Sequence, residues 1–164
     1  MHAQGEAPEP VKSAAMPPAT DDEIREKYLE RAIRELNLFT RDLQACDRCP
    51  RGNLMPVLGS GHPQADVLLL KHAPTPAEIE EVAIVQPKIV VVMGTDALDV
   101  LNELQLPLAR EVEMLPGTIQ RLTPSIDALY VPDIDRSLDE ESAKRDFWRA
   151  FRELGTWWAD FPPY

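Results

Sequence analysis

The sequence predicts an α/β fold of three layers, in which a central, mainly parallel sheet is flanked by helices. Two continuous apolar runs, at residues 65–72 and 87–94, have the composition of strands that are buried on both faces. A helix-starting pattern follows each run, at residues 75–85 and 95–104. The chain then continues through a hairpin and closes with a last helix.

The N-terminal segment divides into a tail and a long helix. Residues 1–19 are rich in Ala, Pro and Glu and are predicted to be disordered. Thr20 and Glu23 form a capping box, after which apolar residues recur at helical spacing down to a pair of cysteines. These apolar residues are Ile24, Tyr28, Ala32, Leu36, Phe39 and Leu43. A single domain is therefore expected over residues 20–164.

The later elements carry local signals of their own. One helix opens with Thr75 and Pro76, and the next is expected to be capped by Thr95. Residues 117–123 and 127–132 read as the two strands of a hairpin.

The last helix is expected to begin at a capping box formed by Ser137 and Glu140. Its core-facing residues should be Ala143, Phe147, either Ala150 or Phe151, and Leu154. Trp157, Trp158 and Phe161 are expected to cover the sheet nearby.

Charge and composition limit the possible classes of protein. The 164-residue chain has a formal net charge of −11, which disfavours broad binding to nucleic acid, although a local basic patch would still permit it. No apolar run approaches the roughly 20 residues of a membrane span, and the N-terminus lacks a signal-peptide pattern. The two cysteines are compatible with a reducing compartment, so a cytoplasmic protein is expected.

Ligands of parallel sheets bind beyond the carboxyl ends of the strands. The turn at Gly94 and Thr95 follows one such end and could hold an anion at a helix N-terminus, or could be an ordinary capped loop. His72 follows another and could act as an acid or base, or be an exposed loop histidine. The acidic run 133–141 could hold a divalent cation or form a solvated helix entry.

Cys46 and Cys49 have a chelating spacing, but a closed zinc or iron–sulfur site needs four ligands. The chain has no other cysteine, and His62 is the nearest further candidate. A free dithiol or a chance pair is the alternative interpretation.

Four segments together resemble the uracil-DNA glycosylase superfamily, in particular its iron–sulfur, type 4-like branch. They are ACDRCP (45–50), PVLGSGHPQADVLLLKHAP (56–74), QPKIVVVMGTDAL (86–98) and ALYVPDIDRSLDEESAKRDFWRAFREL (128–154). The resemblance spans about residues 36–155. It implies that family's fold and base-excision DNA repair, in which uracil is flipped out of DNA and its N-glycosidic bond is hydrolysed.

The resemblance also implies site residues. Contacts to DNA or uracil would come from Gly59, Gly61, Pro74, Gly94 and Thr95, and the cysteine pair would ligate a 4Fe–4S cluster.

Two motif positions differ from the family. His72 stands where the family has its catalytic acid, and Asp133-Ile134-Asp135 stands at the His-Pro-Ser position. The resemblance therefore makes His72 and Asp133 the candidate catalytic residues. A neutral His72 imidazole could orient water, whereas an aspartate at the second position would repel a developing uracil anion.

The family's middle segment is also absent between the strand that ends at His72 and the one that starts at Lys88. That segment holds the other two cluster cysteines, so an incomplete or absent cluster is expected within one chain. Losing a strand exposes apolar edges, which predicts a homodimer or poor solubility. The alternative functions are a catalytically impaired member that binds DNA or a protein, and a metal or redox module built on Cys46 and Cys49.

Overall fold

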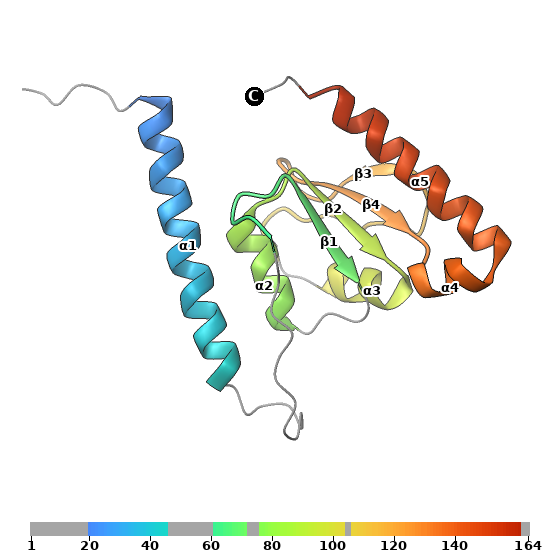
Figure 1. Ribbon diagram of the computed structural model, residues 1–164, viewed down its shortest axis with the longest axis horizontal. Helices are drawn as coiled ribbons and strands as arrows, with labels where there is room; N and C mark the ends of the chain where they lie inside the picture. The colour runs from blue at the N-terminus through green and yellow to red at the C-terminus, as the bar shows by residue number, and fades with distance from the viewer. Residues whose placement is uncertain (1–19, 46–60, 72–75, 104–105, 162–164) are drawn as a thin grey trace, which may run out of the picture.

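A four-stranded sheet forms the centre of the protein, in the spatial order β1-β2-β4-β3 (Figure 1). The computed structural model describes residues 20–45, 61–71, 76–103 and 106–161. The strands are β1 (Val67–Lys71), β2 (Ile89–Met93), β3 (Ile119–Arg121) and β4 (Asp127–Val131). The first, second and fourth run parallel, and β3 pairs antiparallel with β4, so the predicted mainly parallel sheet and its hairpin are confirmed.

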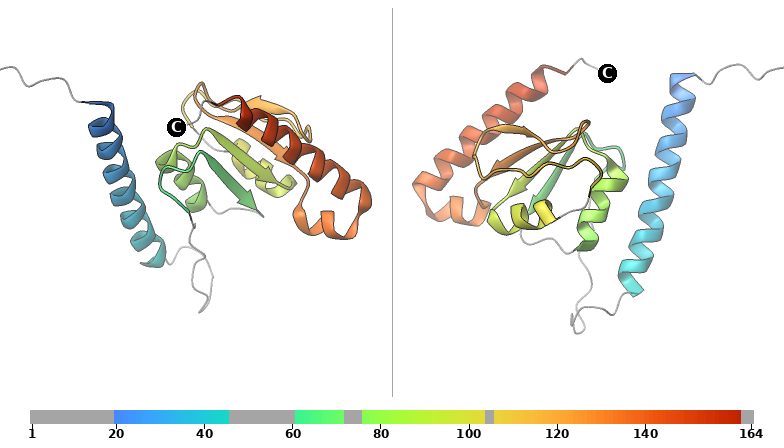
Figure 2. Two further views of the ribbon diagram at one scale, coloured as in Figure 1. Left: turned by 45° about the horizontal axis from the view of Figure 1, so that its top comes forward. Right: turned by 180° about the vertical axis from the view of Figure 1, so that it is seen from behind.

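Helices cover both faces of this sheet (Figure 2). They are α1 (Asp21–Ala45), α2 (Pro76–Val85), α3 (Thr95–Glu103), α4 (Ile134–Asp139) and α5 (Glu141–Ala159). The α2 and α3 helices pack on one face and α5 packs on the other, which gives three layers. Among the described residues, no helix combines the length and the apolar character needed to cross a membrane.

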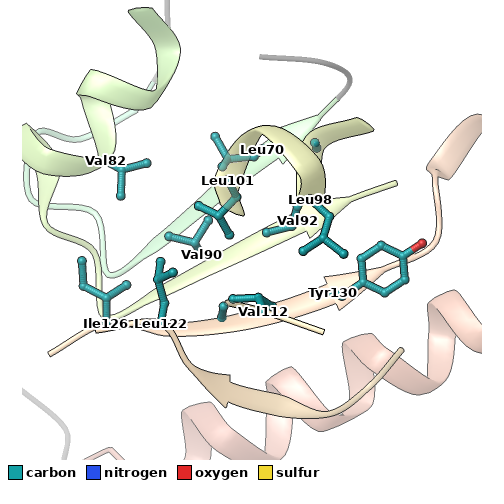
Figure 3. Close-up of a cluster of buried hydrophobic side chains, with 12 residues drawn as sticks. Leu70, Val82, Val90, Val92, Leu98, Leu101, Val112, Leu122, Ile126 and Tyr130 are labelled. Carbon is teal, nitrogen blue, oxygen red and sulfur yellow. The ribbon is translucent and has the colours of Figure 1, made fainter. Parts of the chain in front are cut away.

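The core has two halves because side chains alternate between the faces of a strand. On one face, Val90 and Val92 pack with Leu101 of α3 and Val82 of α2 (Figure 3). On the other face, Val91 packs in a cluster with residues of β4 and α5. All residues of β2 and β4 are buried, as expected of strands inside a parallel sheet.

The α1 helix begins with the predicted capping box. The Thr20 N–H donates to Glu23 Oε2 (2.8 Å), and the Glu23 N–H donates to Thr20 Oγ1 (3.3 Å). Its predicted apolar face is covered only in part: Ala32 is buried, whereas Ile24 and Tyr28 are exposed. The α1 helix packs against α2, which lies at the margin of the sheet.

The predicted start of the last helix is wrong. The chain forms α4 first, because the Asp133 Oδ1 atom accepts the Asp135 N–H (2.7 Å) and starts a helix before Ser137. Ser137 is buried inside α4, where its hydroxyl donates to the Asp133 carbonyl (2.7 Å). Glu140 ends α4 and makes no side-chain cap to α5.

The expected core face of α5 is confirmed. Ala143 and Ala150 are buried, and the half-buried apolar residues on the same side pack against the sheet. These are Phe147, Phe151, Leu154 and Trp157. The Trp157 indole also donates to Asp127 Oδ2 at the start of β4 (2.9 Å).

Candidate functional site

The carboxyl ends of the three parallel strands meet at one edge of the sheet. Lys71 lies in register with Met93, and Met93 lies in register with Val131. The ends of these three strands therefore lie side by side, at the edge of the sheet where α/β proteins place their ligands. We call this region the carboxyl edge.

Gly94 and Asp133 lie close together at the carboxyl edge. Gly94 has φ +89°, and its N–H donates to the Val131 carbonyl (3.0 Å). A Cβ atom at Gly94 would lie 3.3 Å from Asp133 Cβ and 3.5 Å from Asp133 Oδ2. Glycine is thus required both by the backbone conformation and by the position of the aspartate.

Gly94 also begins α3. Its carbonyl accepts the Leu98 N–H (3.3 Å), so Gly94 rather than Thr95 occupies the N-cap position. Thr95 and Asp96 form the exposed first turn, and the N–H groups of this turn are directed at the carboxyl edge.

Asp133 is held in place by the helix that it caps. One carboxylate oxygen, Oδ1, accepts the Asp135 N–H, and the backbone carbonyl accepts both the N–H and the hydroxyl of Ser137. Because Oδ1 forms the cap, Oδ2 is the oxygen that lies nearest to Gly94. The structure therefore fixes a carboxylate beside the α3 N-terminus.

Further charged groups lie on β1 and α4, the elements that adjoin the carboxyl edge. Lys71 Nζ lies 3.6 Å from Asp135 Oδ1, and Arg136 Nε donates to Glu140 Oε1 (3.0 Å). Tyr130, at the end of β4, is 6% exposed, and this burial raises the pKa of its phenol. The charge of Arg136 opposes that rise, and the charge of Asp133 adds to it. Tyr130 is consequently a protonated hydrogen-bond donor at neutral pH.

Sequence reasoning missed Tyr130 and Arg136 as part of this region. Both lie three residues from Asp133, Tyr130 at a strand end and Arg136 on a short helix. This short spacing was the sequence signal that could have identified them, because residues a few positions before and after a strand end remain near that end. Figure 3 shows the Tyr130 hydroxyl at the margin of the apolar core.

The structure brings together the predicted site residues Gly94, Thr95 and Asp133. Gly61 is exposed, and a Cβ atom there would contact nothing within 4 Å. The segment after Gly61 lies at the opposite, amino end of β1. The other predicted site residues lie outside the described residues: Cys46, Cys49, Gly59, His72 and Pro74. In the described ranges, no group of three or more His, Cys, Asp or Glu residues could hold a metal ion.

A hollow of about 530 Å³ lies at the amino end of the sheet, between α1 and the segment that enters β1. Its charged groups are largely paired: Arg31 with Glu35 (2.7 Å) and Lys88 with Asp66 (3.0 Å). This hollow lies at the opposite end of the parallel strands from the carboxyl edge.

The outer face of α5 carries a cationic stripe around an exposed tryptophan. Trp148 is 60% exposed and lines a hollow of about 780 Å³ together with basic side chains. These basic residues are Lys144, Arg145, Arg149 and Arg152. Arg145, Arg149 and Arg152 are spaced by four and three residues, and Lys144 lies four residues before Trp148, so all four border the same side of the helix as Trp148. The acids Glu141 and Asp146 line the same hollow, and Asp146 pairs with Arg149 (2.9 Å).

Comparison with known proteins adds no family assignment: no protein-family model matches the chain, and no curated protein matches its sequence.

Proposed function

We propose that this chain is a uracil-DNA glycosylase-like protein of base-excision DNA repair, which hydrolyses the N-glycosidic bond of uracil in DNA. The observation that carries the proposal is the approach of Gly94 and Asp133 at the carboxyl edge. The resemblance assigns both residues to the catalytic region, although they are far apart in the sequence.

The reaction develops negative charge on the departing uracil and positive charge on the sugar. We assign Asp133 to the sugar, because a carboxylate stabilises an oxocarbenium-like centre and can orient the attacking water. Its Oδ2 atom serves this role, since Oδ1 is engaged in the α4 cap. The N–H groups at the start of α3 would bind a DNA phosphate or a uracil oxygen.

The cationic stripe of α5 supports DNA as the partner. The chain is acidic as a whole, yet the hollow at Trp148 is lined by four basic residues against two acids. Basic side chains neutralise phosphates, and an exposed indole stacks on a base of single-stranded nucleic acid. The proposed substrate is therefore uracil in DNA that is at least locally single-stranded.

Uracil release from an oligonucleotide with one uracil tests the activity. The informative variant is Asp133→Asn, because the amide oxygen can still accept the Asp135 N–H and preserve the α4 cap. We expect release to fall by about 100-fold in this variant, the scale of losing a positioned acid–base group. Asp139→Asn, an exposed change at the end of the same helix, should leave release unchanged. No release from folded wild-type protein would refute the proposed activity.

A catalytically impaired member that binds DNA or a protein is the second candidate. Asp96, Asp133 and Asp135 all lie at the carboxyl edge, where carboxylates oppose a departing uracil anion. Binding of a uracil oligonucleotide without release would favour this candidate. Loss of that binding in Trp148→Ala would assign it to the α5 stripe.

The resemblance also leads to a proposal about the cofactor. Cys46 and Cys49 supply two of the four ligands of a 4Fe–4S cluster, so we propose that a single chain holds an incomplete cluster or none. Iron analysis of protein purified without oxygen tests this proposal, and a metal lost in Cys46→Ser would favour a metal or redox module.

A further inference from the structure

The β1 strand forms one margin of the sheet, although its sequence is that of an interior strand. It pairs with β2 along one side. Among the described residues, no backbone hydrogen bond reaches its other side. The unpaired N–H and C=O groups of such a strand can hydrogen-bond to another strand.

The side chains of β1 are open on the face that α5 covers elsewhere. Leu69 is 55% exposed, whereas Val91, its register partner on β2, is fully buried. The difference arises because α5 packs over β4 and the adjacent part of β2 but does not extend across β1.

An apolar hollow of about 330 Å³ lies between β1 and α5. It is lined by Val67, Phe151, Leu154, Gly155 and Trp158. Trp158 is 41% exposed, so a large aromatic surface adjoins the open strand. We call the outer edge of β1, Leu69 and this hollow the β1 surface.

The β1 strand has few of the features that usually prevent edge pairing. Edge strands are commonly blocked by prolines, bulges or charges that point along the edge. The Val67–Lys71 strand contains one charged residue, Lys71 at its end, and that side chain lies 3.6 Å from Asp135 of the same chain.

We propose that β1 pairs antiparallel with β1 of a second copy of this chain, across a two-fold axis at Leu69. The two sheets then form one continuous sheet. Leu69 faces its own counterpart, Leu68 faces Leu70, and Val67 faces Lys71. Such pairing is self-complementary, as a two-fold interface requires.

The area that a stable dimer must bury explains why we include the hollow between β1 and α5 in the proposed interface. Stable complexes bury roughly 800 Å² per partner, which is more than a five-residue strand edge provides. Covering Leu69 and the adjoining hollow adds apolar area on the same face of the joined sheet. A second copy supplies both the strand and the apolar side chains, so we favour it over an unrelated peptide.

The mass of the full-length chain in solution, measured by light scattering over a range of concentrations, tests the proposal. We expect wild-type protein at about twice 18.4 kDa. Leu69→Glu should have the mass of a single chain, because two carboxylates would face each other in the pair. Leu138→Glu is the matched control: Leu138 is 78% exposed on α4, and its change should leave the dimer intact.

Disulfide trapping tests the register. Directly opposed Cα atoms of antiparallel strands are about 4.5–5.5 Å apart, which is within disulfide range. Leu69→Cys should therefore form a Cys–Cys link between two copies at this position, identified by mass spectrometry. Leu68→Cys should not, because its counterpart would lie two residues out of register. The native cysteines are the same in both variants.

Three outcomes would overturn the proposal. They are a wild-type protein that keeps the mass of one chain at the highest concentration, a Leu69→Glu variant that remains dimeric, and a dimer of Leu69→Cys that contains no link at residue 69. Circular dichroism of each variant confirms that it is folded, and Leu69 is exposed in the single chain, so its replacement should not unfold the protein.

Discussion

Replacing Gly94 by alanine should destabilise the protein at the carboxyl edge. The added methyl group meets two separate obstacles. Gly94 has φ +89°, a backbone conformation that residues with a side chain rarely adopt. The new Cβ would also lie 3.3 Å from the Cβ of Asp133, closer than an ordinary van der Waals contact.

The two obstacles have separate costs. A non-glycine residue held in an unfavourable backbone conformation costs on the order of 1–3 kcal/mol. Asp133 can move away only by weakening its bond to the Asp135 N–H, and losing an N-cap costs about 0.5–2 kcal/mol. We therefore expect the free energy of unfolding to fall by about 1.5–5 kcal/mol in Gly94→Ala.

Urea unfolding followed by circular dichroism measures this change. Gly155→Ala is the matched control, because Gly155 lies in α5 and a Cβ there meets nothing within 4 Å. The control should gain up to about 1 kcal/mol from the higher helix propensity of alanine. A Gly94→Ala free energy of unfolding equal to that of wild type would refute the reasoning, since Gly94 would then be dispensable for the approach of Asp133.

Two further predictions concern other parts of the fold. Asn102→Ala should lower the free energy of unfolding by about 1–3 kcal/mol, because its amide pairs with both the carbonyl and the N–H of buried Val112 (2.9 Å each). In urea unfolding, Asn37→Ala at an exposed position of α1 should not lower the free energy of unfolding, and equal losses of stability in the two variants would contradict the prediction. Burial raises the pKa of Tyr130 above 10.0, so the folded state holds the phenol proton more tightly than the unfolded state. The Tyr130 phenol should leave the free energy of unfolding unchanged below pH 10.0 and should lower it as the pH rises above 10.0. Urea midpoints above pH 10.0 should therefore fall less in Tyr130→Phe than in wild type. An equal fall of the urea midpoint in both proteins would contradict this prediction.

Local sequence patterns predicted most elements because the apolar runs and the helix caps agree with the tertiary structure. The β2 run IVVVM is buried on both faces, and its composition alone indicates an interior strand. The division between α4 and α5 was not predictable in the same way. Asp133 and Ser137 are both good N-cap residues, and the helix begins at Asp133, the residue that also packs against Gly94.

The candidate site was predictable where one topological rule applies. Parallel strands bring their carboxyl ends together, so Gly94 and Asp133 were expected at the same edge. Their distance was not predictable, because it depends on the positive φ of Gly94 and on the start of α4. The position of β1 within the sheet was not predictable either. Its apolar sequence indicates an interior strand, and only the strand order reveals that it lies at the margin.

The proposed dimer and the proposed reaction are separable because of strand direction. If two β1 strands pair antiparallel, their carboxyl ends point in opposite directions. The two carboxyl edges, each with its own Gly94 and Asp133, then lie at opposite ends of the joined sheet and remain open to DNA. Leu69→Glu should therefore yield single chains with unchanged uracil release per chain. Release that disappears together with the dimer would mean that the second copy completes the site, and would contradict the independence of the two edges.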